Sequence, residues 1–298
     1  MQRIAALLAV LLPGAAAAQT SAVAELWRVA ATTLTTPEAL ATGGASSLWN
    51  PAQLPPTGRA SLSLEVVQSP SAVGAGGALA VARVRVRPLG VLGAVYGNMR
   101  IQDLVHTTID PTTDGSGIPY GTQLLGFNWT LTHRGTTLGA TVGWEHARLN
   151  EVSDDQATFD MGLRQDLPGR IWLSIASHLF APLTEDKPVP DLFGGIEWAA
   201  WRGASWKGSG QATLAVRYGA AVAHGSPPDH QFGLGLAFSQ SFAVDVRVIR
   251  EETYGSIGWR GSAGVRIGIG RYRVTYARDT GANDIGSAYR VGLEAGVK

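Results

Sequence analysis

Apolar and polar residues alternate along most of this chain, and this period of two constrains the fold more than any other feature. In the run Ser61–Val66, for example, every second residue is apolar. Successive side chains of a β-strand point to opposite faces, so this alternation predicts strands with one apolar and one polar face. From about Arg59 to the C-terminus the sequence therefore predicts an all-β fold.

The alternating runs predict fourteen strands, with boundaries that are approximate to within a few residues. They cover residues 59–67, 78–87, 90–102, 122–132, 136–149, 156–166, 170–180, 191–201, 210–222, 230–239, 241–250, 254–269, 271–278 and 287–298. Several of them exceed the roughly 5–6 residues typical of soluble strands and suit the roughly 9–11 residues of a tilted membrane crossing.

The connections between these strands alternate between short and long. Those after strands two, four, six, ten and twelve are tight, as at His133–Thr136, whereas most of the others are long and polar, as at Asp103–Gly121. Two connections break the rule, because Arg202–Ser209 is long and Glu251–Thr253 is short. A soluble β-sandwich or lipocalin-like barrel has no reason to sort its loops in this way. The pattern favours a transmembrane antiparallel β-barrel of about 14 strands.

Aromatic residues are predicted to gather near both ends of the barrel wall, at the level of lipid headgroups. Ordinary core aromatic residues are the alternative. The expected positions are Trp129, Trp198 and Tyr272 at the short-turn end, and Trp144, Trp259, Tyr276 and Tyr289 at the long-loop end.

The first residues have the features of a secretory signal peptide, namely Arg3, an apolar run at Ile4–Leu12 and Ala16–Ala18 before Gln19. A membrane anchor is the alternative, but the apolar run is shorter than the roughly 20 residues that a spanning helix needs. We therefore expect a cleaved signal peptide at 1–18, an N-terminal periplasmic or plug segment at 19–58 and a barrel at 59–298. The expected location is the bacterial outer membrane, with its lipids as partners.

Composition excludes several classes of protein. The chain is 45% apolar, which is too much for a disordered protein, and its formal charge of 24 − 23 = +1 argues against nucleic acid as a partner. It contains no cysteine, which excludes thiolate nucleophiles, disulfides and thiolate metal sites.

If the apolar face of each strand meets lipid, the charged residues on the other face line the barrel. This inward set comprises Arg83, Arg85, Arg164, Arg217, Arg247, Arg266, Arg273 and Arg290, with Glu65, Glu145, Asp160, Glu197, Asp245 and Glu294. One interpretation is a ladder of arginine–carboxylate pairs that stiffens the interior. The other is that unpaired arginines attract an anionic solute or the head of an amphiphile, with Arg83, Arg85, Arg217, Arg247, Arg266 and Arg273 as the candidate ligand-binding residues.

Catalytic and metal-binding arrangements are weak in this sequence. Ser174 and His178 share a predicted strand face, but at about 3.3 Å per residue they lie about 13 Å apart and cannot form a hydrogen bond. The loop His224–His230 could offer two imidazoles to a metal, and Asp154 with Asp155, or Asp110 with Asp114, could collect calcium. A flexible loop with two prolines and solvated loop charges explain these residues better than metal ligation does, so we expect no enzyme, metal or cofactor.

The segment before the first strand contains a run of small residues followed by Trp49-Asn50-Pro51-Ala52-Gln53-Leu54. It resembles the long-chain fatty acid transporter (FadL) superfamily of outer-membrane barrels, including its smaller PorV/PorQ-like branch, in which an aromatic-Asn-Pro-Ala-x-Leu element precedes the first of fourteen strands. Trp49, Asn50 and Pro51 correspond to structural positions. The segment is short for a full plug, and the charged inward face differs from a greasy fatty-acid pocket.

The resemblance implies one of two functions. The first is a passive channel or binding protein for hydrophobic or amphipathic small molecules that resemble fatty acids. The second is a non-enzymatic surface scaffold that meets proteins of a secretion system, for which the loops Asp103–Gly121 and Pro182–Pro190 are candidates.

Overall fold

The computed structural model describes most of the chain beyond the amino terminus. Among the helices of this part, none has the length and hydropathy of a membrane-spanning helix. The described residues are 22–44, 46–53, 58–70, 73–102, 104–105, 117–180, 189–204, 211–222, 227–239, 241–253, 256–281 and 286–297. The predicted signal peptide at 1–18 lies outside them, so its cleavage stays a prediction.

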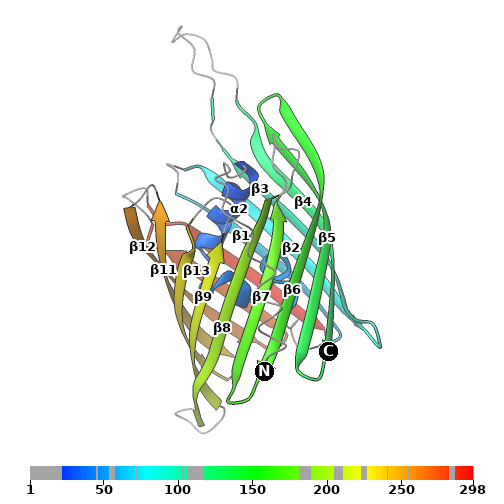
Figure 1. The fold of residues 1–298 in the computed structure, drawn as a ribbon, viewed down its shortest axis with the longest axis vertical. Coiled ribbons are helices and arrows are strands. Elements are labelled where there is room, and N and C mark those ends of the chain that lie inside the picture. The colour runs from blue at the N-terminus through cyan, green and yellow to red at the C-terminus, as the bar shows by residue number, and fades with distance from the viewer. Residues whose placement is uncertain are drawn as a thin grey trace.

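The described residues form a closed barrel of fourteen antiparallel strands, in which each strand pairs with its neighbour in sequence (Figure 1). The last strand pairs with the first from Ala60 opposite Val297 to Gln68 opposite Tyr289. Closure leaves the sheet without a free edge strand along its length. The strands are β1 (Ala60–Gln68), β2 (Ala75–Val86), β3 (Gly90–Ile101), β4 (Tyr120–His133), β5 (Thr136–Leu149), β6 (Val152–Leu167), β7 (Ile171–Phe180), β8 (Val189–Ala204), β9 (Gln211–Val222), β10 (Asp229–Phe238), β11 (Phe242–Thr253), β12 (Ser256–Ile269), β13 (Tyr272–Asp279) and β14 (Tyr289–Val297).

The fourteen strands confirm the sequence prediction, but two connections were wrong. Glu251–Thr253 is the end of β11, where Glu251 still pairs with Gly258 and Thr253 with Ser256 of β12. Arg202 lies within β8 and pairs with Thr213 of β9. Both errors have the same physical origin, because polar residues continue a strand where it emerges from the apolar band.

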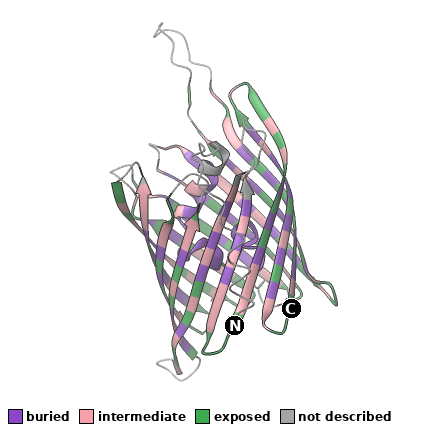
Figure 2. Ribbon diagram, viewed as in Figure 1, coloured by how far each residue is buried: buried purple, intermediate pink, exposed green. Residues whose placement is uncertain are grey.

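The outer face of the barrel is apolar, as the alternation predicts. Exposed and buried residues alternate along the strands in Figure 2, and Leu62, Phe127 and Val142 are among the large apolar side chains that face outward. All seven aromatic residues expected at the rims are exposed, by between 41% for Trp129 and 62% for Trp259. These residues therefore belong to the outer wall and not to a core.

Residues 22–44 and 46–53, which we call the inner segment, lie inside the barrel (Figure 1). They form α2 (Ala22–Thr32), the 3₁₀ helix η2 (Glu38–Leu40) and α3 (Ser46–Trp49). Leu26, Trp27 and Trp49 form a hydrophobic cluster with inward-facing wall residues such as Val95 and Met99.

Glycines in the wall allow the inner segment to approach closely. A Cβ atom on Gly139 of β5 would lie under 3.0 Å from the Pro51 carbonyl group and the Ala52 nitrogen, and one on Gly162 of β6 would meet Asn50 as closely. Gly195 of β8 faces Leu40 in the same way. The wall therefore has glycine, which lacks a side chain, at positions where the inner segment makes contact.

We predict that Gly139→Ala destabilises the protein by about 1–3 kcal/mol, because the added methyl group overlaps the backbone of the inner segment. Urea unfolding in lipid vesicles, followed by tryptophan fluorescence, measures the change. Gly194→Ala is the matched control, because a Cβ at Gly194 meets nothing within 4 Å. Equal stability of the two variants would contradict the close contact.

Candidate functional site: the barrel lumen

Part of the lumen wall is a ladder of arginine–carboxylate pairs. Arg217 forms ion pairs with Glu197 and Asp245, and the Nη1–Oδ1 distance to Asp245 is 2.6 Å. Arg266 contacts the other oxygen of Asp245 at 3.2 Å. These contacts run across β8, β9, β11 and β12 and support the interpretation that the inward charges stiffen the barrel.

Two wall arginines bind the end of α2. Arg247 Nη2 donates hydrogen bonds to the carbonyl oxygens of Ala31 at 2.7 Å and Thr32 at 3.0 Å. Arg290 Nη2 donates to the Ala30 carbonyl at 2.5 Å. The last carbonyls of a helix have no partner within it and carry partial negative charge, so cations are favourable there.

Arg247 also holds η2. It is 1% exposed, and its Nη1 atom lies 3.2 Å from Glu38 Oε1. The second Glu38 oxygen accepts a hydrogen bond from Gln231 Nε2 at 2.5 Å. Arg247 therefore joins β11 to both α2 and η2, and its charge is compensated by Glu38.

Arg83 and Arg164 bind the rest of the inner segment. Arg83 of β2 donates to the Ser46 hydroxyl at 2.6 Å, to the Ser47 hydroxyl and to the Gly43 carbonyl at 3.2 Å. Arg164 of β6 donates to Gln53 Oε1 at 3.1 Å. Four inward arginines thus act mainly as anchors for the inner segment.

The Trp49-Asn50-Pro51 element is held by specific contacts. Asn50 Nδ2 donates to the Ala39 carbonyl at 2.7 Å, and Asn50 Oδ1 accepts from the Ala52 N–H at 2.9 Å. Thr130 of β4 donates to the Pro51 carbonyl at 2.8 Å. Trp49 packs edge-on against Phe193 at a ring-centroid distance of 5.7 Å. These contacts explain an Asn-Pro pair at this position.

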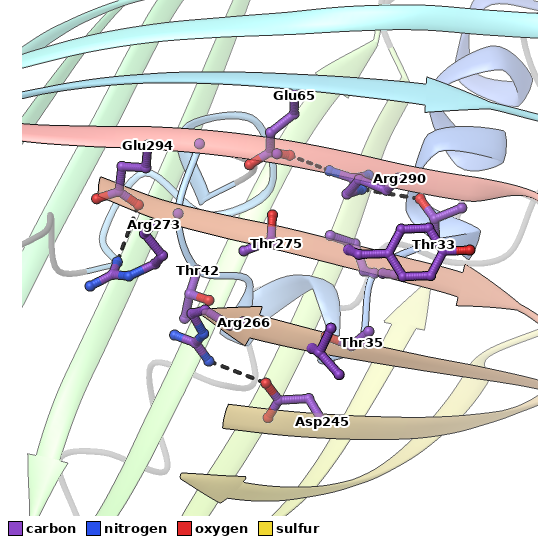
Figure 3. Close-up of a pocket in the computed structure, with 18 of the residues that line it drawn as sticks. Thr33, Thr35, Thr42, Glu65, Asp245, Arg266, Arg273, Thr275, Arg290 and Glu294 are labelled. Carbon is purple, nitrogen blue, oxygen red and sulfur yellow. Dashed lines mark hydrogen bonds and ion pairs between the residues drawn. The ribbon is translucent and has the colours of Figure 1, made fainter. Parts of the chain in front are cut away.

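A polar cavity of about 80 Å³ lies between the inner segment and the wall formed by β11 to β14 and β1. In Figure 3, Arg266 and Arg273 project toward it from neighbouring strands, each joined to a carboxylate, Asp245 or Glu294. Their side chains keep 30% and 31% exposure. Of the six arginines predicted to bind a ligand, these two line the cavity, whereas Arg83, Arg217 and Arg247 are occupied by protein groups.

Arg85 has a different position from the other five. It is exposed near the end of β2, and its side chain forms no hydrogen bond or ion pair with the part of the chain that the structure describes. It therefore belongs to the short-turn end of the barrel and not to the central network.

The other candidate chemistry is engaged in structural contacts. Ser174 is fully buried and accepts a hydrogen bond from Gln53 at 3.0 Å, whereas His178 lies 2.7 Å from Asp160. Asp155 accepts from His146 at 2.8 Å, and His230 contacts the Tyr218 hydroxyl at 2.8 Å. Within the described ranges no three His, Asp or Glu side chains group as metal ligands. His224, Asp110 and Asp114 lie outside those ranges.

The expectation that charge dominates the lumen was wrong for one side. Leu79, Met99, Leu124 and Phe193 face inward from β2, β3, β4 and β8 and are 1–6% exposed. They lie in the half of each strand nearest the long loops. The period of two predicts their inward direction, because Leu79 and Arg83 are separated by an even number of positions on β2 and so point to the same face.

Comparison with solved structures supports the barrel. The chain is similar to the Ralstonia pickettii toluene transporter TbuX, with 11% identity over 91% of this chain and 98% of that one and a TM-score of 0.59. It is also similar to the Acinetobacter baumannii outer membrane protein Omp33, with 8% identity over 80% of this chain and 97% of that one and a TM-score of 0.48. No family model and no curated protein matches the sequence. The likeness to TbuX confirms the outer-membrane-type barrel fold and leaves the narrower PorV/PorQ-like assignment a prediction.

We predict that Arg247→Gln loosens the inner segment, because it leaves Glu38 buried without its positive partner. Breaking a buried pair in this way costs about 3–5 kcal/mol. Hydrogen–deuterium exchange should be faster at the end of α2 and in η2. Arg266→Gln is the control, since Arg266 contacts wall residue Asp245, which keeps Arg217. Unchanged exchange in Arg247→Gln would refute the anchoring role.

Proposed function

We propose that this protein is an outer-membrane barrel that passively admits or binds small hydrophobic or amphipathic molecules. The closed sheet, its apolar outer face and its exposed aromatic residues support placement in a membrane. The bacterial outer membrane is the location that such barrels occupy.

The observation that carries this proposal is the apolar side of the lumen. Water-filled porins have polar interiors. Here Leu79, Met99 and Leu124 face inward near the long loops and form one cluster with Trp27 and Trp49. The inner segment packs on these side chains and leaves them only 1–6% exposed, so a hydrophobic molecule reaches this apolar surface once the inner segment shifts. Such a surface favours its binding over that of water-soluble solutes.

The opposite side of the lumen suits the polar part of an amphiphile. Its cavity presents Arg266 and Arg273, whose guanidinium groups remain partly exposed although each has a carboxylate partner. TbuX, whose fold this chain shares, is described as a transporter of toluene, an apolar molecule. The proposed ligand therefore has a hydrophobic body, with or without an anionic head.

The inner segment stands between the two sides, so passage through the barrel requires it to shift. Its contacts with Arg83, Arg247 and Arg290 oppose that shift. In this proposal the anchoring arginines set how readily the path opens, and they do not bind the solute themselves.

The test is binding of a fluorescent long-chain fatty acid to the detergent-folded mature barrel. We predict saturable binding whose affinity falls about tenfold or more when Met99→Gln and Leu124→Gln are combined, because burying an unsatisfied amide costs about 1–3 kcal/mol. The control combines Leu125→Gln and Met161→Gln, which lie on the outer face with 52% and 56% exposure. Electrophoretic mobility without boiling confirms that each barrel is folded.

Absence of saturable binding to a folded wild-type barrel would overturn the transport proposal. The remaining candidate would then be the surface scaffold of a secretion system that the sequence resemblance also implies. Equal loss of affinity in both double variants would contradict the apolar side of the lumen as the binding surface.

A further inference from the structure

Six exposed arginines surround the short-turn end of the barrel, and we call them the basic rim. They lie before β1, in the turns β2–β3, β4–β5, β6–β7 and β12–β13, and near the end of β8. The β10–β11 turn has no arginine at its described positions, Ser239 and Ser241. The basic rim consists of Arg59, Arg87, Arg134, Arg170, Arg202 and Arg271.

The positive charge of the basic rim is not compensated by acidic side chains of the residues that the structure describes. Within the described part of the chain, none of the six forms an ion pair. The carboxylates near this end already have arginine partners, since Asp166 pairs with Arg164 and Glu294 with Arg273. With Arg85 included, seven arginines at this end have no ion pair with a described residue. The surface is therefore strongly positive although the whole chain carries only +1.

The basic rim lies at the level of the outer aromatic residues. Tyr272 is 44% exposed, and Arg271 both stacks on its ring, 5.0 Å from the centroid, and donates to its hydroxyl at 2.8 Å. Trp129 Nε1 donates to the carbonyl of Leu89, in the same turn as Arg87. Exposed aromatic residues of membrane barrels mark the depth of the lipid headgroups.

A third aromatic residue repeats this arrangement. Trp198 of β8 is 49% exposed and pairs with Ile171, which directly follows Arg170. At three separate places around the barrel, a rim arginine thus adjoins an outward-facing aromatic ring. The guanidinium groups accordingly lie where phosphates of the membrane surface would be found.

We infer that the basic rim binds the phosphodiester headgroups of anionic phospholipids in the leaflet that meets the short turns. The inference rests on the proposed membrane placement, not on the proposed ligand. Guanidinium groups suit this partner because they donate to phosphate in a bidentate way, and 21 of the chain's 24 basic residues are arginine.

The circular distribution favours lipids over other anions. Adjacent turns are two strands apart, or about 10 Å at about 4.8 Å per strand, so one small anion reaches at most one or two of the six. An acidic protein would approach the short turns along the barrel axis. Its binding would not require the outward-facing aromatic residues that lie beside the rim arginines. A leaflet surrounds the barrel and offers a phosphate to every turn.

The test uses the mature barrel reconstituted into phosphatidylcholine vesicles that contain a minor share of phosphatidylglycerol. After gentle detergent extraction, mass spectrometry gives the ratio of the two lipids that remain bound. We expect phosphatidylglycerol to be enriched over its share in the vesicle, and combined Arg87→Gln, Arg134→Gln and Arg170→Gln to reduce this enrichment roughly fivefold. High salt should reduce the wild-type enrichment in the same direction.

The control removes the same charge from the opposite end through Arg100→Gln, Arg148→Gln and Arg278→Gln, all at exposed positions. This control should keep the wild-type enrichment. A barrel that inserts but retains no excess phosphatidylglycerol, or loses it equally in both triple variants, would overturn the lipid inference and leave the membrane placement standing. A folded barrel that does not insert into these vesicles would overturn the membrane placement itself.

Discussion

Closure of the backbone hydrogen-bond ladder is the constraint from which the rest of this structure follows. In lipid, an unpaired backbone N–H or C=O group costs several kcal/mol, so the strands must pair around a full circle. The pairing of β14 with β1 completes that circle. Each wall residue then faces either lipid or lumen. All specific chemistry of the wall between its two ends is consequently confined to alternate positions on the inside.

Inside that wall, charge requires compensation. An arginine as buried as Arg247 is strongly unfavourable unless its guanidinium is paired and hydrogen-bonded. Glu38 supplies the opposite charge and the end of α2 supplies carbonyl oxygens. The dependence is mutual, because Arg247 in turn fixes the end of α2 and η2 against the wall. The wall and the inner segment are therefore one structural unit. The arginines midway along the strands hold the two parts together.

The sequence predicted the wall far better than the site. Alternation along the chain is a local signal, so it located the strands and showed that Arg247 and Arg290 face inward. Partners are not local, since Arg247 and Glu38 are 209 positions apart. The sequence analysis considered only the charged inward-facing positions. It therefore missed Leu79 and Met99, which also face inward but carry no charge. The Trp49-Asn50-Pro51 element was recognisable, yet its contact with Gly139 and Gly162 joins parts of the chain that are far apart in sequence.

The interior and the rim together give the barrel a polarity along its axis. Apolar side chains such as Met99 lie near the long loops, compensated pairs such as Arg247–Glu38 lie midway along the strands, and uncompensated arginines ring the short turns. A molecule with a hydrophobic body gains most from the first region. The middle region offers it little, because those arginines are already neutralised by protein groups. A molecule that moves past this layer must therefore break contacts between the wall arginines and the inner segment. The inner segment, and not the wall, then controls whether a path through the barrel opens.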